Sequence, residues 1–315
     1  MDSFLLALSV VLPMLIMMSV GVLTRRAGLV DAHSAKKMDG LNFRLFLPCL
    51  LFVNIYQSDL AHDFSVRVVL YVLASFFVLM SLLFLIVPRL MKRPEQISVV
   101  CQAIFRGNFV IFGLTVTEYI YGPGSTGTAS LLSAIVVPLM NVTAVILLEY
   151  FRPGGGGHVE PKKLVMGVVK NPLILGCVLA LAAVLLGIDL PDMIFSPIQS
   201  MSRVATPLAF VLLGATLSLD GFRRNKTILA WTVFMRMIIV PAVTIVTAIL
   251  LGFRNVELAS IMVLFSAPTA VSSFSMAQQM GADGELAAQL VALTAVFALP
   301  TIFTITFLLR LLGYL

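Results

Sequence analysis

The chain has 315 residues, of which 60% are hydrophobic and 11% charged, and its mean hydropathy is +1.05. This composition excludes a water-soluble globular domain, because only lipid can cover so much apolar surface. The formal net charge is +6, but the basic residues cluster in short connectors between apolar stretches. We therefore interpret them as signals of membrane orientation and expect no nucleic-acid partner.

Ten apolar stretches follow one another, each near the roughly 20 residues that a transmembrane helix needs. The first five cover residues 4–24, 38–56, 66–87, 96–119 and 127–151. The second five cover residues 164–188, 193–219, 227–253, 256–280 and 286–312. The sequence therefore predicts an all-α membrane protein with ten transmembrane helices.

Residues 152–163 separate the two sets of stretches and are rich in glycine and proline, as in a flexible connector. A phosphate-binding glycine loop would need a preceding strand and a following Lys-Ser or Lys-Thr pair, and the sequence has neither. We thus expect two units, 1–151 and 164–315, joined by a cytoplasmic linker.

The two units also share a pattern of prolines. Three prolines of the first unit recur about 160 positions later: Pro13 and Pro172, Pro48 and Pro207, Pro138 and Pro300. Because each unit has an odd number of stretches, the second must cross the membrane in the opposite direction. Inverted repeats are typical of secondary transporters, which bind substrate near the midplane where helices are broken.

Lysine and arginine accumulate in cytoplasmic loops, so their distribution predicts orientation. One set of connectors contains Arg25, Arg26, Lys36, Lys37, Arg89, Lys92, Arg93, Arg152, Lys162, Lys163, Arg223, Arg224 and Lys226. The opposite side has only Arg67, Arg254 and Arg310. The asymmetry predicts a multi-pass protein of the cytoplasmic (inner) membrane with both termini outside the cytoplasm.

The fourth and ninth stretches are the least uniformly apolar, and they correspond under the same shift. The fourth contains Arg106, Gly107, Asn108 and Gly113, and the ninth contains Ala267 and Pro268 followed by several hydroxyl residues. Proline removes an amide donor and glycine weakens a helix. We therefore predict helix breaks at Gly107, Gly113, Ala267 and Pro268, where exposed helix N-termini would attract an anion.

Several short motifs, taken in order and spacing, resemble the auxin efflux carriers, meaning the plant PIN carriers and bacterial permeases often named malate or malonate transporters. The motifs are Arg106-Gly107-Asn108 through Gly113, Pro138-Leu139-Met140-Asn141-Val142, Asn171-Pro172-Leu173-Ile174, Pro207-Leu208-Ala209, Arg236 with Pro241-Ala242-Val243, and Ser266-Ala267-Pro268. The resemblance covers nearly the whole chain. It implies a ten-helix inverted-repeat fold like that of bile-acid symporters and sodium/proton antiporters, with helices 4 and 9 crossing at their breaks.

The chain departs from that family at the fourth stretch. Many relatives carry proline shortly after the glycine that matches Gly113, or just before the asparagine that matches Asn108. This chain has Thr115 and Gly107 at those places. A break there would depend on glycine and on packing.

Arg106 is the strongest candidate for substrate binding. A charge at that depth costs about 2.5 to 3.5 kcal/mol on insertion scales, so it needs a partner. The nearest acid on the same stretch, Glu118, is twelve positions away, and we find no Asp or Glu near mid-depth in the other stretches. An anionic substrate is one predicted partner, and a structural role with backbone carbonyls or water is the alternative.

Six further residues complete the predicted substrate site: Asn108, Asn141, Pro268, Ser272, Ser273 and Arg236. Asn108 and Asn141 offer amide donors and acceptors for a carboxylate, although such residues also bond helix to helix. Ser272 and Ser273 supply hydroxyls beside Pro268 at the ninth-stretch break. Arg236 also lies near mid-depth, and the family resemblance leaves open that it braces the scaffold instead.

These features together predict a secondary transporter that moves a small organic anion, a mono- or dicarboxylate or an auxin-like acid, by alternating access of a rocking or elevator type. The alternatives are a carboxylate receptor that does not transport and a cation/proton antiporter, which needs carboxylates at the crossing. No catalytic or metal motif indicates an enzyme. The sequence implies no cofactor. It leaves open whether transport is coupled to protons, to sodium or to neither, and whether the protein forms a homodimer.

Overall fold

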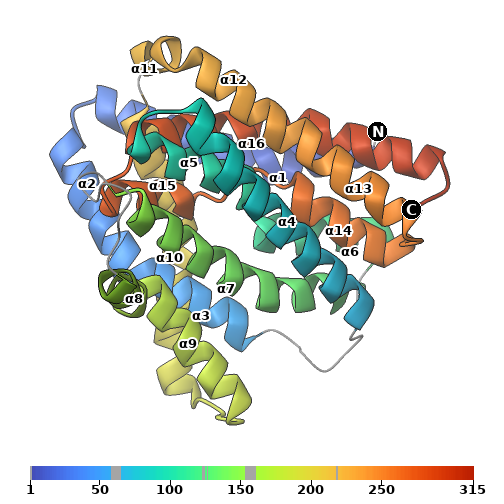
Figure 1. Ribbon diagram of the computed structural model, residues 1–315. Helices are drawn as coiled ribbons and strands as arrows, with labels where there is room; N and C mark the ends of the chain where they lie inside the picture. The colour runs from blue at the N-terminus through green and yellow to red at the C-terminus, as the bar shows by residue number, and fades with distance from the viewer. Residues whose placement is uncertain (1, 58–64, 123–124, 126, 153–160, 218) are drawn as a thin grey trace.

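The structure is a computed structural model that describes residues 2–57, 65–122, 125, 127–152, 161–217 and 219–315. Its helices, drawn in Figure 1, are α1 (Asp2–Arg26), α2 (Ala32–Leu41), η1 (Asn42–Phe46), α3 (Leu47–Tyr56), α4 (Val66–Leu90), α5 (Pro94–Phe105), α6 (Phe109–Tyr121), α7 (Gly127–Tyr150), α8 (Pro161–Val169), α9 (Pro172–Leu185), α10 (Asp192–Thr216), α11 (Leu219–Arg224), α12 (Lys226–Phe234), η2 (Met235–Ile239), α13 (Val240–Leu250), α14 (Asn255–Ser266), α15 (Ser272–Gln279) and α16 (Gly284–Leu311).

Within these residues the structure has helices and one isolated β-bridge, so the predicted all-α class is confirmed for them. In the described part of the chain, six helical segments are long and apolar enough to cross a membrane, and α9 and α14 are shorter apolar helices. Two of the six are composite: α2, η1 and α3 run on as one segment, as do α12, η2 and α13. Both termini lie toward the same side of the molecule in Figure 1.

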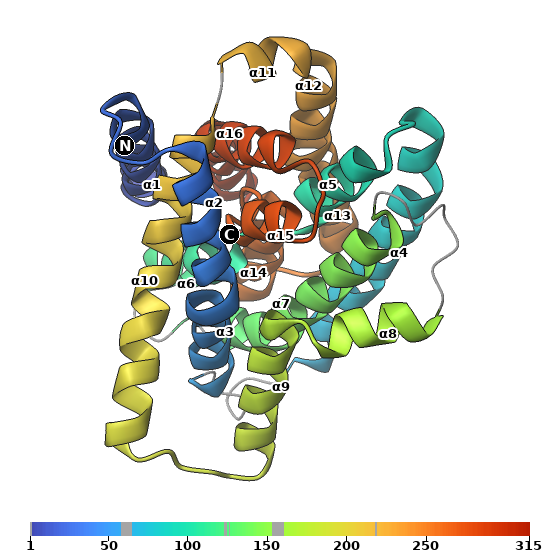
Figure 2. The same ribbon diagram turned by 90° about the vertical axis from the view of Figure 1, so that its left-hand side faces the viewer.

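The helices pack as two bundles (Figure 2). In the first bundle, α10 packs against α1, α2, η1 and α3, and α3 packs against α9. In the second bundle, α5 packs against α4, α7 and α16, while α14 packs against α6 and α13, and α16 against α12 and α15. The two bundles meet chiefly where α1 packs along α16.

Glycine explains why α1 and α10 lie so close together. A Cβ at Gly21 would overlap the carbonyl of Val211, and a Cβ at Gly214 would overlap the carbonyl of Met18. Small residues let two helix backbones approach closely, and this is a main source of helix association in membranes. The pair therefore forms a tight wall of the first bundle.

The stretch over residues 164–188 was predicted as one helix, and that prediction is wrong. The structure ends α8 at Val169 and begins α9 at Pro172, and α8 runs across the end of α9 (Figure 2). The Asn171 side chain accepts a hydrogen bond from the Leu173 amide at 2.9 Å, which caps α9. Asparagine at the N-cap followed by proline is a strong helix start.

Most of the predicted linker, 153–160, lies outside the described residues.

Candidate binding site at the crossing of two broken helices

Two helices are interrupted at the middle of the second bundle. α5 ends at Phe105 and α6 begins at Phe109, with Arg106 in an extended backbone conformation between them. α14 ends at Ser266 and α15 begins at Ser272. Ala267 is also extended, as expected for a residue before proline.

The two interruptions pair with each other as a short antiparallel bridge. Gly107 pairs with Thr269, the Asn108 amide donates to the Pro268 carbonyl at 2.7 Å, and the Ala270 amide donates to the Arg106 carbonyl at 3.0 Å. Non-helical backbone at membrane depth is stable only when its polar groups are satisfied within the protein. The bridge provides that satisfaction, so each break supports the other.

Arg236 joins the same two breaks from η2. Its side chain is 0% exposed, and it donates to the Ala267 carbonyl at 3.0 and 2.6 Å and to the Ile104 carbonyl at 2.8 Å. These carbonyls terminate α14 and α5, where the helix dipole places partial negative charge. The charge of Arg236 is thus compensated by backbone carbonyls, and neither Arg236 nor these two acceptor residues line the cavity described below.

The two glycines predicted at the α5/α6 break, Gly107 and Gly113, lie in different environments. A Cβ at Gly107 would overlap the Arg236 guanidinium, so only glycine fits between the bridge and Arg236. Gly113, which was predicted at the break, lies inside α6 instead, where its missing Cβ makes room for the ring of Phe109. Packing on Phe109, rather than a backbone break, explains a glycine at that position.

Arg106 is 3% exposed and is held by side chains. Nη1 donates to Ser273 Oγ at 3.3 Å and to Met276 Sδ at 2.8 Å, and Nη2 donates to Asn141 Oδ1. Among the described residues, no Asp or Glu forms an ion pair with it. Its positive charge is therefore balanced only by neutral dipoles.

A cavity of about 80 Å³ lies beside Arg106, between the crossing and the first bundle. Its polar lining residues are Asn54, Arg106, Asn108, Asn141, Thr206 and Ser272. Asn141 is 0% exposed, and its Nδ2 has no hydrogen-bond partner. A buried amide donor without a partner costs about 1 to 3 kcal/mol, so a group that accepts this bond would be stabilised here.

The structure brings four of the predicted site residues to this cavity: Arg106, Asn108, Asn141 and Ser272. Ser273 supports Arg106 from behind, while Pro268 and Arg236 belong to the crossing. The cavity also includes two polar residues of the first bundle that were not predicted, Asn54 on α3 and Thr206 on α10. Each is a polar residue inside an apolar stretch, and this feature of the sequence could have identified both as candidates for the site.

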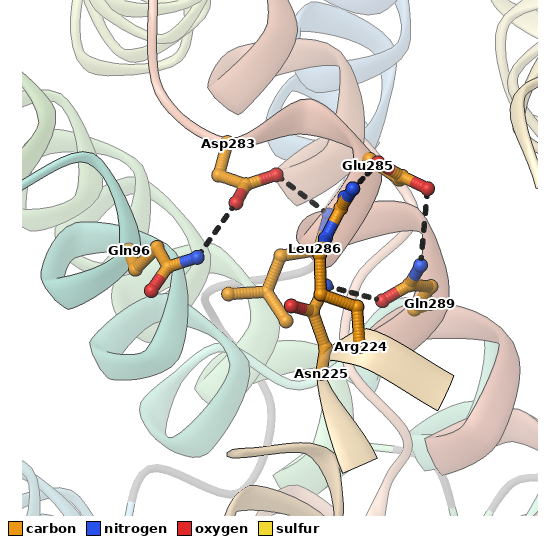
Figure 3. A network of polar contacts seen from close by, with 7 residues as sticks. All are labelled: Gln96, Arg224, Asn225, Asp283, Glu285, Leu286 and Gln289. Carbon is orange, nitrogen blue, oxygen red and sulfur yellow. Dashed lines mark hydrogen bonds and ion pairs between the residues drawn. The ribbon is translucent and has the colours of Figure 1, made fainter. Parts of the chain in front are cut away.

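Side-chain contacts also tie the second bundle together at the N-terminal ends of α5, α12 and α16 (Figure 3). Gln96 Nε2 donates to Asp283 Oδ2 at 3.0 Å, and Asn225 Nδ2 donates to Gln289 Oε1 at 2.9 Å. Asp283 also caps α16 by accepting from the Leu286 amide. These contacts favour movement of these helices as one body.

Comparison with known proteins gives consistent matches along the chain. The model of a family described as "Membrane transport protein" matches residues 6–306. A "Putative malonate transporter" of Rhizobium meliloti is 24% identical over 95% of this chain and 95% of its own length. An uncharacterized transporter of Methanocaldococcus jannaschii is 22% identical over 94% and 96%, and one of Escherichia coli K12 is 22% identical over 85% and 86%.

Proposed function

Since the chain belongs to the family of membrane transport proteins that includes the auxin efflux carriers, we propose that it carries a small organic anion through the membrane at the cavity beside Arg106. The family match confirms the resemblance found in the sequence motifs. A relative named as a malonate transporter makes a small dicarboxylate the first substrate to test.

The observation that carries this proposal is a buried guanidinium with no acidic partner among the described residues, next to the unpartnered Asn141 Nδ2. Guanidinium groups bind carboxylates by charge-assisted hydrogen bonds, and a carboxylate has two oxygens to accept them. One carboxylate oxygen bound to Arg106 and the other to Asn141 would satisfy both groups. The N-terminal ends of α6 and α15, at Phe109 and Ser272, line the same space and favour negative charge.

The size of the cavity favours a small acid. Its volume of about 80 Å³ is near half of the roughly 150 Å³ cavity that accommodates benzene. A two- to four-carbon carboxylate is compatible with this space. An auxin-sized aromatic acid would require the bundles to separate further.

For the architecture we propose two inverted five-helix units, 1–151 and 164–315, in the cytoplasmic membrane with both termini outside. The paired breaks, one at Gly107 and one at Pro268, support this division, because each unit contributes one broken helix to the crossing. Arg236 then braces the crossing, and Arg106 serves the substrate.

The position of the cavity supports alternating access. Leu50, Leu51, Asn54 and Thr206 come from the first bundle, whereas the crossing belongs to the second. Movement of one bundle against the other would therefore open the cavity to each side of the membrane in turn.

Transport by the purified protein in proteoliposomes tests this function. We expect flux of radiolabelled malonate or of another acid in a panel of acetate, malate and indole-3-acetate. Arg106→Ala should reduce that flux at least about a hundredfold, because a charge-assisted bond and its partner are lost together. Arg203→Ala is the matched control, since Arg203 is exposed and its bond is to Gln199 of its own helix.

The competing function is a receptor that binds a carboxylate without moving it. Thermal stabilisation by the acid together with zero flux would favour the receptor, and unchanged flux in Arg106→Ala would refute the role of Arg106. The carrier names of the relatives favour transport.

A further inference from the structure

Asp39 is a buried carboxylate that the predicted site does not include. It lies on α2 of the first bundle and is 0% exposed. Its Oδ1 accepts a hydrogen bond from Ser275 Oγ at 2.5 Å, and its Oδ2 accepts one from Gln279 Nε2 at 2.9 Å. Both donors lie on α15 of the second bundle, so Asp39 connects the two bundles.

No cation compensates this carboxylate among the described residues. The other charged or titratable groups of α2, and those of the neighbouring η1 and α10, are exposed. They are His33, Lys36, Lys37, Arg44, Asp192 and Arg203. α15 itself carries no charged residue. A buried carboxylate without a cation beside it is costly to keep ionised, so its negative charge here depends on the two donors from α15.

α15 bonds both to Asp39 and to Arg106, and so it links Asp39 to the substrate cavity. Ser273 and Met276, three positions apart, bond to Arg106 on one face of this eight-residue helix. Ser275 and Gln279, four positions apart, bond to Asp39 on another face. Any shift of α15 that follows binding at Arg106 therefore changes the contacts of Asp39.

A groove opens one helical turn from Asp39. Ala35 and Lys36, which precede Asp39 on α2, line a groove of about 620 Å³ together with Gln278 at the end of α15. Asp39 is thus buried in the present conformation and adjacent to a wide polar opening.

We propose that Asp39 is the proton-binding group that couples transport to a pH gradient, an inference that rests on the proposed function. The ionised carboxylate holds α15 through Ser275 and Gln279 and so holds the two bundles together. Separating α15 from an ionised Asp39 would leave a buried charge without donors, which is strongly unfavourable. Proton uptake removes that charge, so the movement of the bundles carries one proton in each cycle.

The test compares wild type with Asp39→Asn, which is neutral at every pH and nearly isosteric. Proteoliposomes with the membrane potential clamped at zero receive radiolabelled malonate, or the panel acid with the highest flux, under a gradient of one pH unit. One proton per substrate predicts about tenfold accumulation by wild type, because one pH unit is worth about 1.4 kcal/mol. Asp39→Asn should equilibrate without accumulation while it still exchanges labelled for unlabelled substrate. Asp31→Asn, the same change at an exposed position of the same helix region, should behave like wild type.

Accumulation by Asp39→Asn in response to the pH gradient would overturn the proposal, as would wild-type accumulation driven by sodium alone. Ser275→Ala gives a second measurement if Asp39→Asn does not fold. It removes one donor to the ionised carboxylate and should move the pH profile of exchange to higher pH, and an unchanged profile would overturn the proposal. A protein that moves no carboxylate at all would instead refute the proposed function.

Discussion

At the scale of single residues, the two buried arginines have the same charge and different surroundings. Arg236 donates only to backbone carbonyls, those of Ile104 and Ala267. Arg106 donates to the side chains of Ser273, Met276 and Asn141 beside a cavity. Backbone partners are fixed by the fold, whereas side chains can rearrange around a ligand. This difference, rather than depth in the membrane, separates a structural arginine from a candidate ligand-binding one.

Gly107 gives a direct test of the crossing. Gly107→Ala would place a Cβ against the Arg236 guanidinium and should lower stability by about 1 to 3 kcal/mol, the usual cost of overpacking. Thermal unfolding in detergent measures the effect. Gly167→Ala is the control, because its nearest atoms belong to the flexible side chain of Glu149. Equal stability of the two variants would contradict the close contact seen at Gly107.

At the scale of helices, the α5/α6 break shows that proline is not required for an interruption. The residues from Arg106 to Asn108 include no proline, yet the helix stops, because the bridge to Thr269 and the bonds from Arg236 satisfy its backbone. The other break contains Pro268 and makes the same contacts. Tertiary contacts therefore maintain both interruptions.

Pro268→Ala should consequently be tolerated. The carbonyl of residue 268 still accepts from the Asn108 amide, and Ala267 is still held by Arg236. We expect a stability change within about 1 kcal/mol, the usual range for proline replacement where the backbone is unstrained, together with retained malonate flux. A large loss of both would show that proline, rather than the bridge, maintains this break.

Sequence patterns identified most of the apolar helices, the two breaks and Arg106, because hydropathy, proline and an intramembrane charge are local signals. They failed where a partner is distant in the chain. Arg236 bonds to Ile104, 132 positions away, which no local pattern reveals. Asp39 is a second example, because hydropathy places it at the end of the apolar stretch that begins at Met38, whereas α2 begins at Ala32 and buries Asp39 against α15. Hydropathy detects residues facing lipid and is insensitive to polar contacts between bundles.

At the scale of the whole molecule, transport by relative movement of bundles predicts that a link between them stops the cycle. Gly40 of the first bundle faces Gln279 of the second, with a Cβ position 3.3 Å from Gln279 Oε1. Gly40→Cys combined with Gln279→Cys, in a background without Cys49, Cys101 and Cys177, allows a short thiol cross-linker to join them. With a bifunctional methanethiosulfonate as the linker, which joins the two cysteines through reducible disulfide bonds, malonate flux should fall to background and return after reduction.

The control for this experiment joins two helices of the same bundle. Asn225→Cys combined with Gln289→Cys replaces a hydrogen-bonded pair between α12 and α16 (Figure 3). Cross-linking there should leave flux unchanged, because both helices belong to one body. Inhibition by both cross-links would argue against movement between the two bundles.

The bridge at the crossing has a consequence for biosynthesis. The Arg106 carbonyl accepts a hydrogen bond from the Ala270 amide, and the Ile104 carbonyl accepts one from the Arg236 side chain. Both donors are synthesised much later than the acceptors, so these bonds cannot form until far more of the polypeptide has left the ribosome. During that interval the early half-helices have an incomplete backbone network in an apolar environment, which is unfavourable. The nascent protein therefore needs the translocon or water to shelter this region. A fragment that stops before Arg236 would never close it.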